Sequence, residues 1–186
     1  GDDTGGAGDA LEKVGGPSGV AVLFRPEIPP LPKAWTRLDG GRGHQMVLRE
    51  LAPVDAPGGV RPLGPADVGE MLALVERTRP GPFATRTVEL GSYLGHRAGG
   101  RLVAMAGERL HVAGFTELSA VCTDTDARKQ GLATRRVRAV AAGVEARDET
   151  PMLHVLAENH AAVRVYENLG FVTRVAFDTI MVQAPR

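Results

Sequence analysis

The chain has 186 residues, 43% of them hydrophobic, and its 22 lysines and arginines balance its 22 aspartates and glutamates. This length and composition predict one domain with a packed core and room for a small subdomain, and they exclude global disorder. The zero net charge argues against bulk attraction to nucleic acid or to an anionic membrane. No apolar run is long enough to span a bilayer. The single cysteine, Cys122, excludes an intrachain disulfide framework and fits a reducing, cytoplasmic compartment.

The first 56 residues carry few signals of regular structure. Residues 1–19 contain seven glycines and few large apolar side chains, which predicts a flexible tail. The apolar run over 20–24 predicts a short strand, and the prolines between 26 and 32 exclude regular structure after it. A second strand could form over 45–51, and residues 53–59 indicate a linker. We expect a tail over 1–19, a segment over 20–56 that packs beside the core as a candidate degenerate half-domain, and a domain over 57–186.

From residue 60 onward, strand and helix signals alternate. The run over 60–63 predicts a short strand, and Pro65 is favoured at the first position of the helix that follows. The buried face of this helix is predicted to consist of Val68, Met71, Leu72 and Val75. The later elements expected are strands over 93–97, 101–109, 117–123 and 152–157, a helix with the apolar stripe Leu132, Val137, Val140 and Val144, a helix from Asn159 to Leu169, and one or two strands over 171–182.

This order of elements predicts an α/β chain, in an α+β arrangement built on a mixed sheet. The helix that lies between two strands after Arg128 implies a parallel strand pair. The turn Ala98-Gly99-Gly100 joins two strands and implies an antiparallel hairpin. We therefore expect a central, strongly twisted mixed sheet with helices on both of its faces.

The segment from Val121 to Ala133 is the most informative part of the chain. A strand ends there in a cluster of turn-forming residues, and a helix begins with the pattern Arg-x-x-Gly-x-Ala, formed by Arg128, Gly131 and Ala133. The first N–H groups of a helix have no partner within it and together suit a phosphate. A glycine lets the backbone come close to such a ligand. The alternative is a glycine-containing turn into a helix with no ligand.

This pattern resembles the acetyl-CoA pyrophosphate loop of the GNAT superfamily of N-acetyltransferases, written Gln/Arg-x-x-Gly-x-Gly/Ala. The segment from Asn159 to Phe171 resembles the closing GNAT motif, Asn-x-x-Ala-x-x-x-Tyr-x-x-x-Gly-Phe, and matches it at all five positions. Two such motifs in this order, separated by a helix and a strand, are far more specific than either alone. The resemblance covers residues 60–183 and implies the GNAT fold, whereas the first 55 or so residues lie outside it.

The resemblance implies how acetyl-CoA would bind. The loop over 128–133 would hold the pyrophosphate, and the strand over 120–123 would line the thioester with backbone N–H groups, which would also stabilise an oxyanion. Asn159, otherwise only a helix cap, would bond to the amide arm of the cofactor, and the small Ala162 would leave room for that arm. The cofactor-binding residues expected on this basis are Ala120, Val121, Cys122, Thr123, Arg128, Lys129, Gln130, Gly131, Leu132, Ala133, Thr134, Asn159, Ala162 and Tyr166.

Tyr166 and Glu117 are the catalytic residues that the resemblance implies. A phenol with an ordinary pKa of about 10 is protonated at neutral pH, so Tyr166 could donate a proton to the departing thiolate. Glu117, on the strand before the loop, could accept the proton of the amine. The alternatives are a core tyrosine at 166 and, at 117, a surface glutamate on an edge or outer face of the sheet.

Other reactive residues near the two motifs have simpler alternatives. His154 and His160 are further candidate bases, although surface or capping positions are favoured for both. Cys122 could form an acetyl-enzyme, but a small buried hydrophobic residue is favoured. No pair of histidines has metal-binding spacing, and no metal is expected. A basic cluster could offset the charge of the phosphates or form a solvated helix face; it consists of Arg128, Lys129, Arg135, Arg136 and Arg138.

The expected function is therefore transfer of an acetyl group from acetyl-CoA to an amine by direct attack in a ternary complex. The acceptor would be a small-molecule amine or a peptide amino group. A homodimer is the only protein assembly that we expect. The alternative is a catalytically silent GNAT-fold module that binds acyl-CoA. A P-loop nucleotide-binding protein is disfavoured because no Gly-Lys-Ser/Thr follows the loop.

Overall fold

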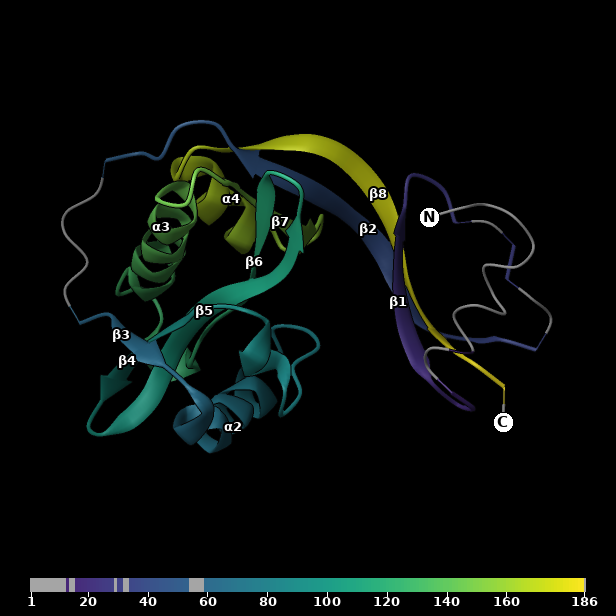
Figure 1. Ribbon diagram of the computed structural model, residues 1–186, viewed down its shortest axis with the longest axis horizontal. Coiled ribbons are helices and arrows are strands. Elements are labelled where there is room, and N and C mark those ends of the chain that lie inside the picture. The colour runs from purple at the N-terminus through teal and green to yellow at the C-terminus, as the bar shows by residue number, and fades with distance from the viewer. Residues whose placement is uncertain (1–12, 14–15, 29, 32–33, 54–58, 186) are drawn as a thin grey trace. The chain divides into compact units, whose positions relative to one another are not determined.

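The computed structural model describes residues 13, 16–28, 30–31, 34–53 and 59–185 (Figure 1). The described residues form strands, α-helices and three short 3-10 turns along the chain. In order these are β1 (Val20–Arg25), β2 (Thr36–Leu48), β3 (Arg61–Leu63), η1 (Pro65–Asp67), α2 (Val68–Thr78), η2 (Thr87–Leu90), β4 (Tyr93–Ala98), β5 (Arg101–Val112), β6 (Phe115–Thr123), η3 (Thr125–Ala127), α3 (Leu132–Glu145), β7 (Thr150–Leu156), α4 (His160–Asn168) and β8 (Phe171–Gln183).

The strands belong to one 8-stranded sheet in the order β1-β8-β2-β7-β6-β5-β4-β3. The pairs β1–β8, β3–β4, β4–β5 and β5–β6 are antiparallel, and the pair β6–β7 is parallel. The parallel pair is the one expected across α3, because a helix crossover returns the chain in the same direction. Figure 1 shows α2 on the opposite side of β5 from α3 and α4. The predicted mixed sheet with helices on both faces is confirmed.

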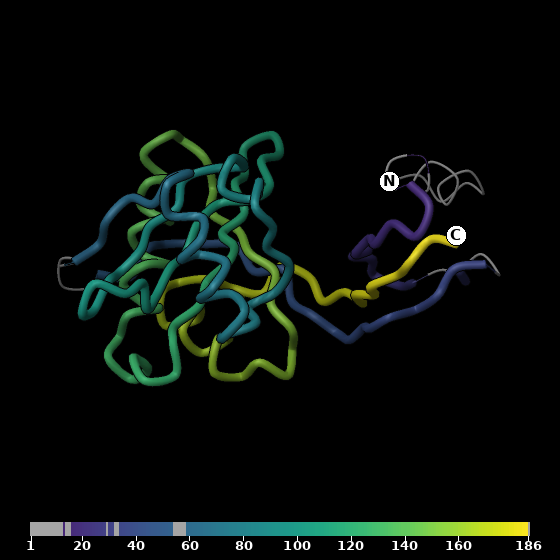
Figure 2. The backbone as a smooth tube through the Cα atoms, turned by 90° about the horizontal axis from the view of Figure 1, so that it is seen from below, coloured from purple at the N-terminus to yellow at the C-terminus, as the bar shows by residue number. Residues whose placement is uncertain are grey.

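The chain divides into two compact units. The first consists of residues 1–45, 155–159 and 174–186, and the second of residues 46–154 and 160–173. In the first unit, β1 pairs with β8 from Val20–Gln183 to Arg25–Asp178 (Figure 2). The division expected at residues 19 and 56 stays a prediction, and most of the tail (1–12 and 14–15) and of the linker (54–58) lies outside the described residues.

One aromatic contact anchors the first unit. The rings of Phe24 on β1 and Phe177 on β8 meet edge to face, with centroids 5.3 Å apart. A Cβ atom at Gly43 of β2 would lie 2.5 Å from the Phe177 ring, so only glycine leaves space for that ring. The strand predicted over 20–24 is confirmed, and its aromatic end packs across to the C-terminal strand.

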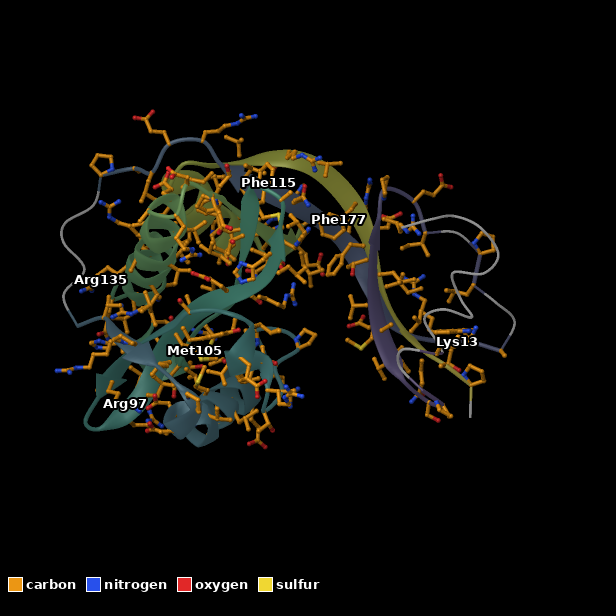
Figure 3. All side chains as sticks on the ribbon, viewed as in Figure 1. Lys13, Arg97, Met105, Phe115, Arg135 and Phe177 are labelled. Carbon is orange, nitrogen blue, oxygen red and sulfur yellow. The ribbon has the colours of Figure 1, made fainter. Side chains whose placement is uncertain are left out.

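The helix α2 buries a slightly different face from the one predicted. Met71 and Leu74 are fully buried, whereas Leu72 is only partly buried. Val68 and Val75 pack at the edge of the same cluster. The run Met-Leu-Ala-Leu offers apolar residues at adjacent helical positions, so its periodicity alone left the centre of the face undetermined. Figure 3 shows Met105 of β5, a further member of this core, close to α2.

The helix α3 confirms the predicted stripe, since Leu132, Val137, Val140 and Val144 are all buried. The bounds of some strands differ more clearly from the predicted ones. The second strand was expected over 45–51, but β2 begins at Thr36 and ends at Leu48. Its first half, Thr36–Gly43, has three glycines and no alternating pattern, so pairing with neighbouring strands rather than local propensity makes it extended. The last strand, β8, is a single strand.

Candidate active site

The parallel pair β6–β7 separates part of the way along. Pairing extends from Phe115–Thr150 to Glu117–Met152 among the described residues, whereas β6 continues to Thr123. Within this continuation, Ala120 and Val121 both lie opposite the single residue Ala106 of β5. Ala120 has φ 52°, in the left-handed region that non-glycine residues rarely adopt. A bulge of this kind leaves backbone groups outside the regular ladder, as the predicted thioester-lining role of residues 120–123 requires.

The predicted phosphate loop lies where β6 meets α3. Arg128, Lys129, Gln130 and Gly131 are all exposed. Lys129 and Gly131 have φ 63° and 69°, so the chain turns twice through the left-handed region before Leu132 begins the helix. Gly131 is the N-cap residue and no side chain caps the helix start. The first N–H groups of α3 therefore have no intrahelical or side-chain acceptor.

The side chain of Arg135 forms hydrogen bonds with two backbone carbonyls of this loop. Its guanidinium donates to the backbone carbonyls of Gln130 and, at 3.4 Å, of Gly131 (Figure 3). A Cβ atom at Gly131 would meet only the Arg135 side chain, at 3.8 Å, so the loop is open around this residue. Because the carbonyls point toward Arg135, an anion at the helix start would meet N–H donors without opposing carbonyl oxygens.

Two arginines of the expected basic cluster form hydrogen bonds with backbone carbonyls of the fold. Arg136 is 0% exposed; its guanidinium donates to the carbonyls of Leu132 at 3.0 Å and Gly59 at 3.2 Å. Burial and the neighbouring charge of Arg135 lower the pKa of Arg136. Arg138 donates to the Ala52 carbonyl at 2.9 Å. Because Arg136 is fully buried, neither the counter-charge nor the solvated-face interpretation fits it, whereas a counter-charge role of Arg138 stays a prediction.

An acidic residue beside the loop is neutralised. Asp124 follows β6 directly and is 6% exposed. Arg77 of α2 donates to it at 3.0 Å, and Arg101 of β5 lies 3.4 Å from it. Two guanidinium groups thus offset the charge of the carboxylate, which would otherwise repel an anion at the start of α3.

Glu117 is buried and contacts two partly buried side chains, Arg109 and His154. Arg109 of β5 donates to both carboxylate oxygens, from Nη2 to Oε1 at 2.6 Å and from Nε to Oε2 at 3.0 Å. His154 Nδ1 of β7 lies 2.8 Å from Oε1. Glu117 is 1% exposed, so the alternative of a surface glutamate is wrong. We call these three residues the charge cluster.

The charge cluster keeps Glu117 ionised. Burial alone would raise the pKa of Glu117, but hydrogen bonds from His154 and Arg109 and the charges of both residues outweigh it, so the pKa lies below its ordinary value. An ionised carboxylate only accepts hydrogen bonds, so His154 Nδ1 carries the proton in this contact. The imidazole is thereby oriented, with Nε2 as its second, distinct nitrogen.

Tyr166 is buried on α4. Its ring meets Phe171 of β8 with centroids 6.0 Å apart. Burial raises the pKa of Tyr166 to about 12, so its hydroxyl is protonated at neutral pH. Ala162, one turn earlier, is partly buried on the same helix. Asn159 belongs to the first compact unit and precedes α4 directly; its backbone N–H donates to the Leu156 carbonyl at 3.0 Å.

Cys122 packs in the hydrophobic core with Leu74 and Met105. Burial raises the pKa of this thiol to about 11, which disfavours the thiolate that a covalent mechanism needs. This environment supports the buried-hydrophobic interpretation. Its neighbour Thr123 has a buried hydroxyl with no hydrogen-bond partner among the described residues.

The sequence reasoning missed Arg109 and the contact that joins His154 to Glu117. The hairpin signal at Ala113-Gly114 could have found the first, because a tight turn there puts Arg109 across from Glu117 on the same sheet face. The second depends on the register of the parallel pair, which no local signal fixes. Within the described ranges no group of three or more metal-binding side chains converges. None of the helices described there combines the length and apolarity that a bilayer crossing needs.

The sequence matches the FR47-like protein family over residues 93–180. The structure is similar to that of a protein from Novosphingobium aromaticivorans assigned to the GNAT family of acetyltransferases. The two share 37% sequence identity with a TM-score of 0.88, and the match covers 97% of this chain and 80% of that one. A search of curated protein sequences gave no match.

Two more distant structures share the fold. A GNAT-family acetyltransferase from Colwellia psychrerythraea has 15% identity and a TM-score of 0.64, over 81% of this chain and 58% of that one. The ribosomal-protein-S18-alanine N-acetyltransferase of Escherichia coli has 24% identity and a TM-score of 0.54, over 68% of this chain and 92% of that one. At these identities the likeness concerns the fold alone.

Proposed function

The chain belongs to the GNAT family of acetyltransferases, which typically use acetyl-CoA, and we propose that it transfers an acetyl group from acetyl-CoA to an amine in a ternary complex. The observation that carries this proposal is the placement of two different groups in the second compact unit. One is an exposed helix start suited to a pyrophosphate; the other is the buried, ionised carboxylate of Glu117 with its two polar partners.

The loop fits the phosphates of CoA. Its helix start lacks a capping side chain, Arg135 holds the carbonyls of Gln130 and Gly131, and the space around Gly131 is open. Arg128 and Lys129 are exposed beside it and supply positive charge. The pyrophosphate would therefore bind to backbone N–H groups of residues 128–133, and the bound thioester would supply the activated acetyl group.

Tyr166 and Glu117 have different roles in proton transfer: Tyr166 donates a proton, and Glu117 favours removal of one. The Tyr166 hydroxyl, with its pKa raised to about 12, stays protonated and can give its proton to a departing thiolate. Glu117, with its pKa lowered, stays negative and favours removal of a proton from a cationic amine. Backbone N–H groups at the Ala120 bulge would bind the carbonyl oxygen as negative charge develops on it.

The acceptor is a small-molecule amine or a peptide amino group, and the reaction takes place in the cytoplasm. The competing candidate is a GNAT-fold module that binds acyl-CoA without turnover. The charge cluster favours the enzyme, because burying the carboxylate of Glu117 costs stability and is not needed for a packed fold.

A screen with a matched control tests the proposal. Purified protein is incubated with acetyl-CoA and one amine at a time, chosen from ethylamine, benzylamine, glycinamide and alanyl-glycinamide, while release of free thiol is followed. We expect turnover with at least one amine above the rate of the Gly131→Asp variant. Calorimetric binding of acetyl-CoA without thiol release for any amine would support the silent module.

A further inference from the structure

We propose that Tyr93 determines which amines the site accepts, because its hydroxyl donates a hydrogen bond to a carbonyl oxygen of the acceptor. That oxygen belongs to the carbon next to the amine-bearing carbon, as in an α-amino amide or the N-terminal residue of a peptide. The inference rests on the proposed function and names the class of its acceptor. A buried hydroxyl without a partner carries it.

Tyr93 lies at the start of β4 and is 2% exposed. Its hydroxyl has no hydrogen-bond partner in the part of the chain that the structure describes, which includes every residue from 59 to 185. Buried polar groups in folded proteins nearly always have such a partner. A phenylalanine would fill the same space without leaving a polar group unsatisfied, so packing alone does not account for the hydroxyl.

The ring of Tyr93 is fixed by its neighbours. Tyr93 pairs with Gly107 of β5, and a Cβ atom at Gly107 would lie only 2.3 Å from the ring. Phe83 meets the ring edge to face, with centroids 5.7 Å apart. The hydroxyl therefore occupies a defined place and cannot turn toward solvent without unpacking the ring.

The hydroxyl lies within electrostatic range of two members of the charge cluster. Arg109 and Glu117 act on its pKa in opposite directions, and burial raises that pKa to about 12. The hydroxyl therefore keeps its proton at neutral pH and can donate a hydrogen bond. Because Glu117 is the residue that favours removal of the amine proton in the proposed function, a group bound to Tyr93 would lie near the amine.

The surroundings of the hydroxyl favour a neutral oxygen over a cation as its partner. Both oxygens of Glu117 already receive hydrogen bonds from Arg109. The carboxylate of Glu108, also within range, forms an ion pair with Arg147 at 3.1 Å. Of the charges that act on the hydroxyl, that of Arg109 has the largest influence. A guanidinium beside an unpartnered O–H favours a partly negative atom there, and a carbonyl oxygen is such an atom.

An acceptor would reach the hydroxyl past Phe83. This residue is partly buried and lies in the stretch 79–86, which forms neither helix nor strand. Segments of this kind open at a lower cost than the paired strands of a sheet. Displacing the Phe83 side chain would therefore expose Tyr93 more readily than separating β4 from β5.

Selectivity among the four amines follows from this arrangement. Glycinamide and alanyl-glycinamide carry the carbonyl oxygen and would satisfy the Tyr93 hydroxyl. Ethylamine and benzylamine lack it and would leave the hydroxyl unpaired in the complex. A buried polar group that a substrate leaves unpaired discriminates against that substrate.

Tyr93→Phe tests the assignment. Thiol release gives kcat/KM for glycinamide and for ethylamine, and we expect the ratio of the two values to fall about 10-fold from wild type to variant. Comparing ratios removes the difference in basicity between the amines, because it is the same for both proteins. The matched control is Tyr166→Phe, which removes the same group from a residue that acts on the sulfur. Its ratio should stay within about twofold of the wild-type ratio.

The outcomes separate this inference from the proposed function. If wild type releases thiol but Tyr93→Phe leaves the ratio unchanged, the role of Tyr93 is overturned and the proposed function stands. Turnover confined to ethylamine and benzylamine also overturns the acceptor class alone. If wild type binds acetyl-CoA but releases no thiol with any of the four amines, the proposed function fails and the acceptor class fails with it.

Thermal unfolding without any amine gives an independent check. Removing an unpartnered buried hydroxyl should leave the Tm of Tyr93→Phe equal to that of the wild type or raise it. A Tm lower by roughly 3 °C or more would show that the hydroxyl has a partner in the resting protein, which overturns the proposal.

Discussion

Gly170, which follows α4 in the closing motif, is predicted to be required for folding rather than for catalysis. A Cβ atom there would lie 1.8 Å from the Glu50 carbonyl oxygen and 3.0 Å from its carbon. The residue has φ 98°, where side chains are strained. The Gly170 carbonyl also accepts a hydrogen bond from Arg49 at 3.0 Å, so the turn and the end of β2 cannot separate without losing it.

The cost of Gly170→Ala follows from these contacts. Backbone strain of about 1–3 kcal/mol, overpacking of about 1–3 kcal/mol and a weakened hydrogen bond of about 1 kcal/mol together lower the free energy of unfolding by roughly 3–7 kcal/mol. For a chain of this length, that corresponds to a Tm lower by roughly 10 °C or more. Urea and thermal unfolding, followed by circular dichroism, measure both quantities.

Gly143→Ala is the matched control, because the same methyl group is added in a different setting. Gly143 lies inside α3, where a Cβ atom would have no neighbour within 4 Å. Replacing a helical glycine with alanine stabilises by up to about 1 kcal/mol. A Gly170→Ala variant whose free energy of unfolding lies within 1 kcal/mol of the wild type would refute this reasoning.

Four further predictions concern the site. Gly131→Asp should abolish acetyl-CoA binding in calorimetry while the protein stays folded, because both bulk and negative charge enter the phosphate loop; undiminished affinity would remove the loop from the site. Tyr166→Phe should lower kcat roughly 10- to 1000-fold with acetyl-CoA affinity and Tm nearly unchanged, because only the proton donor is lost; normal turnover would make Tyr166 a core residue. Arg109→Met should lower the free energy of unfolding by about 3 kcal/mol, because Glu117 stays buried without its guanidinium partner. The lowered pKa of Glu117 means that its stabilising contribution is complete above the ordinary value of 4.5 and is lost as the pH falls below it, so wild-type unfolding between pH 3 and 7 should show a steeper acid loss than Glu117→Gln; equal slopes would contradict the pKa shift.

Local signals were enough for several elements of the second compact unit. The stripe of α3 and the hairpin of β4 and β5 are encoded in periodicity and turn residues, and all four predicted positions of α3 are buried. The first half of β2 has no such signal. Its glycines accommodate neighbours such as Phe177, whose position depends on residues more than 130 places away in the chain. Pairing between residues so far apart in the chain cannot be predicted from short stretches of sequence.

The sequence predicted the location of the candidate site but not the contacts between its side chains. The motifs located the loop around Gly131 and the helix that carries Tyr166. They did not reveal that Glu117 is bonded to Arg109 and His154, because that contact joins three strands whose register is set by the whole sheet. They also suggested five similar basic residues, although Arg136 is buried by the packing of α3.

Direct detection of acetyl transfer tests the central claim. The protein is incubated with acetyl-CoA carrying a carbon-13-labelled acetyl group and with the four amines together, and the amines are analysed by mass spectrometry. The account predicts that labelled acetyl appears on at least one amine in proportion to the thiol released, and that Gly131→Asp and Tyr166→Phe reduce both in parallel. Saturable acetyl-CoA binding with no labelled amine above the protein-free control would contradict it.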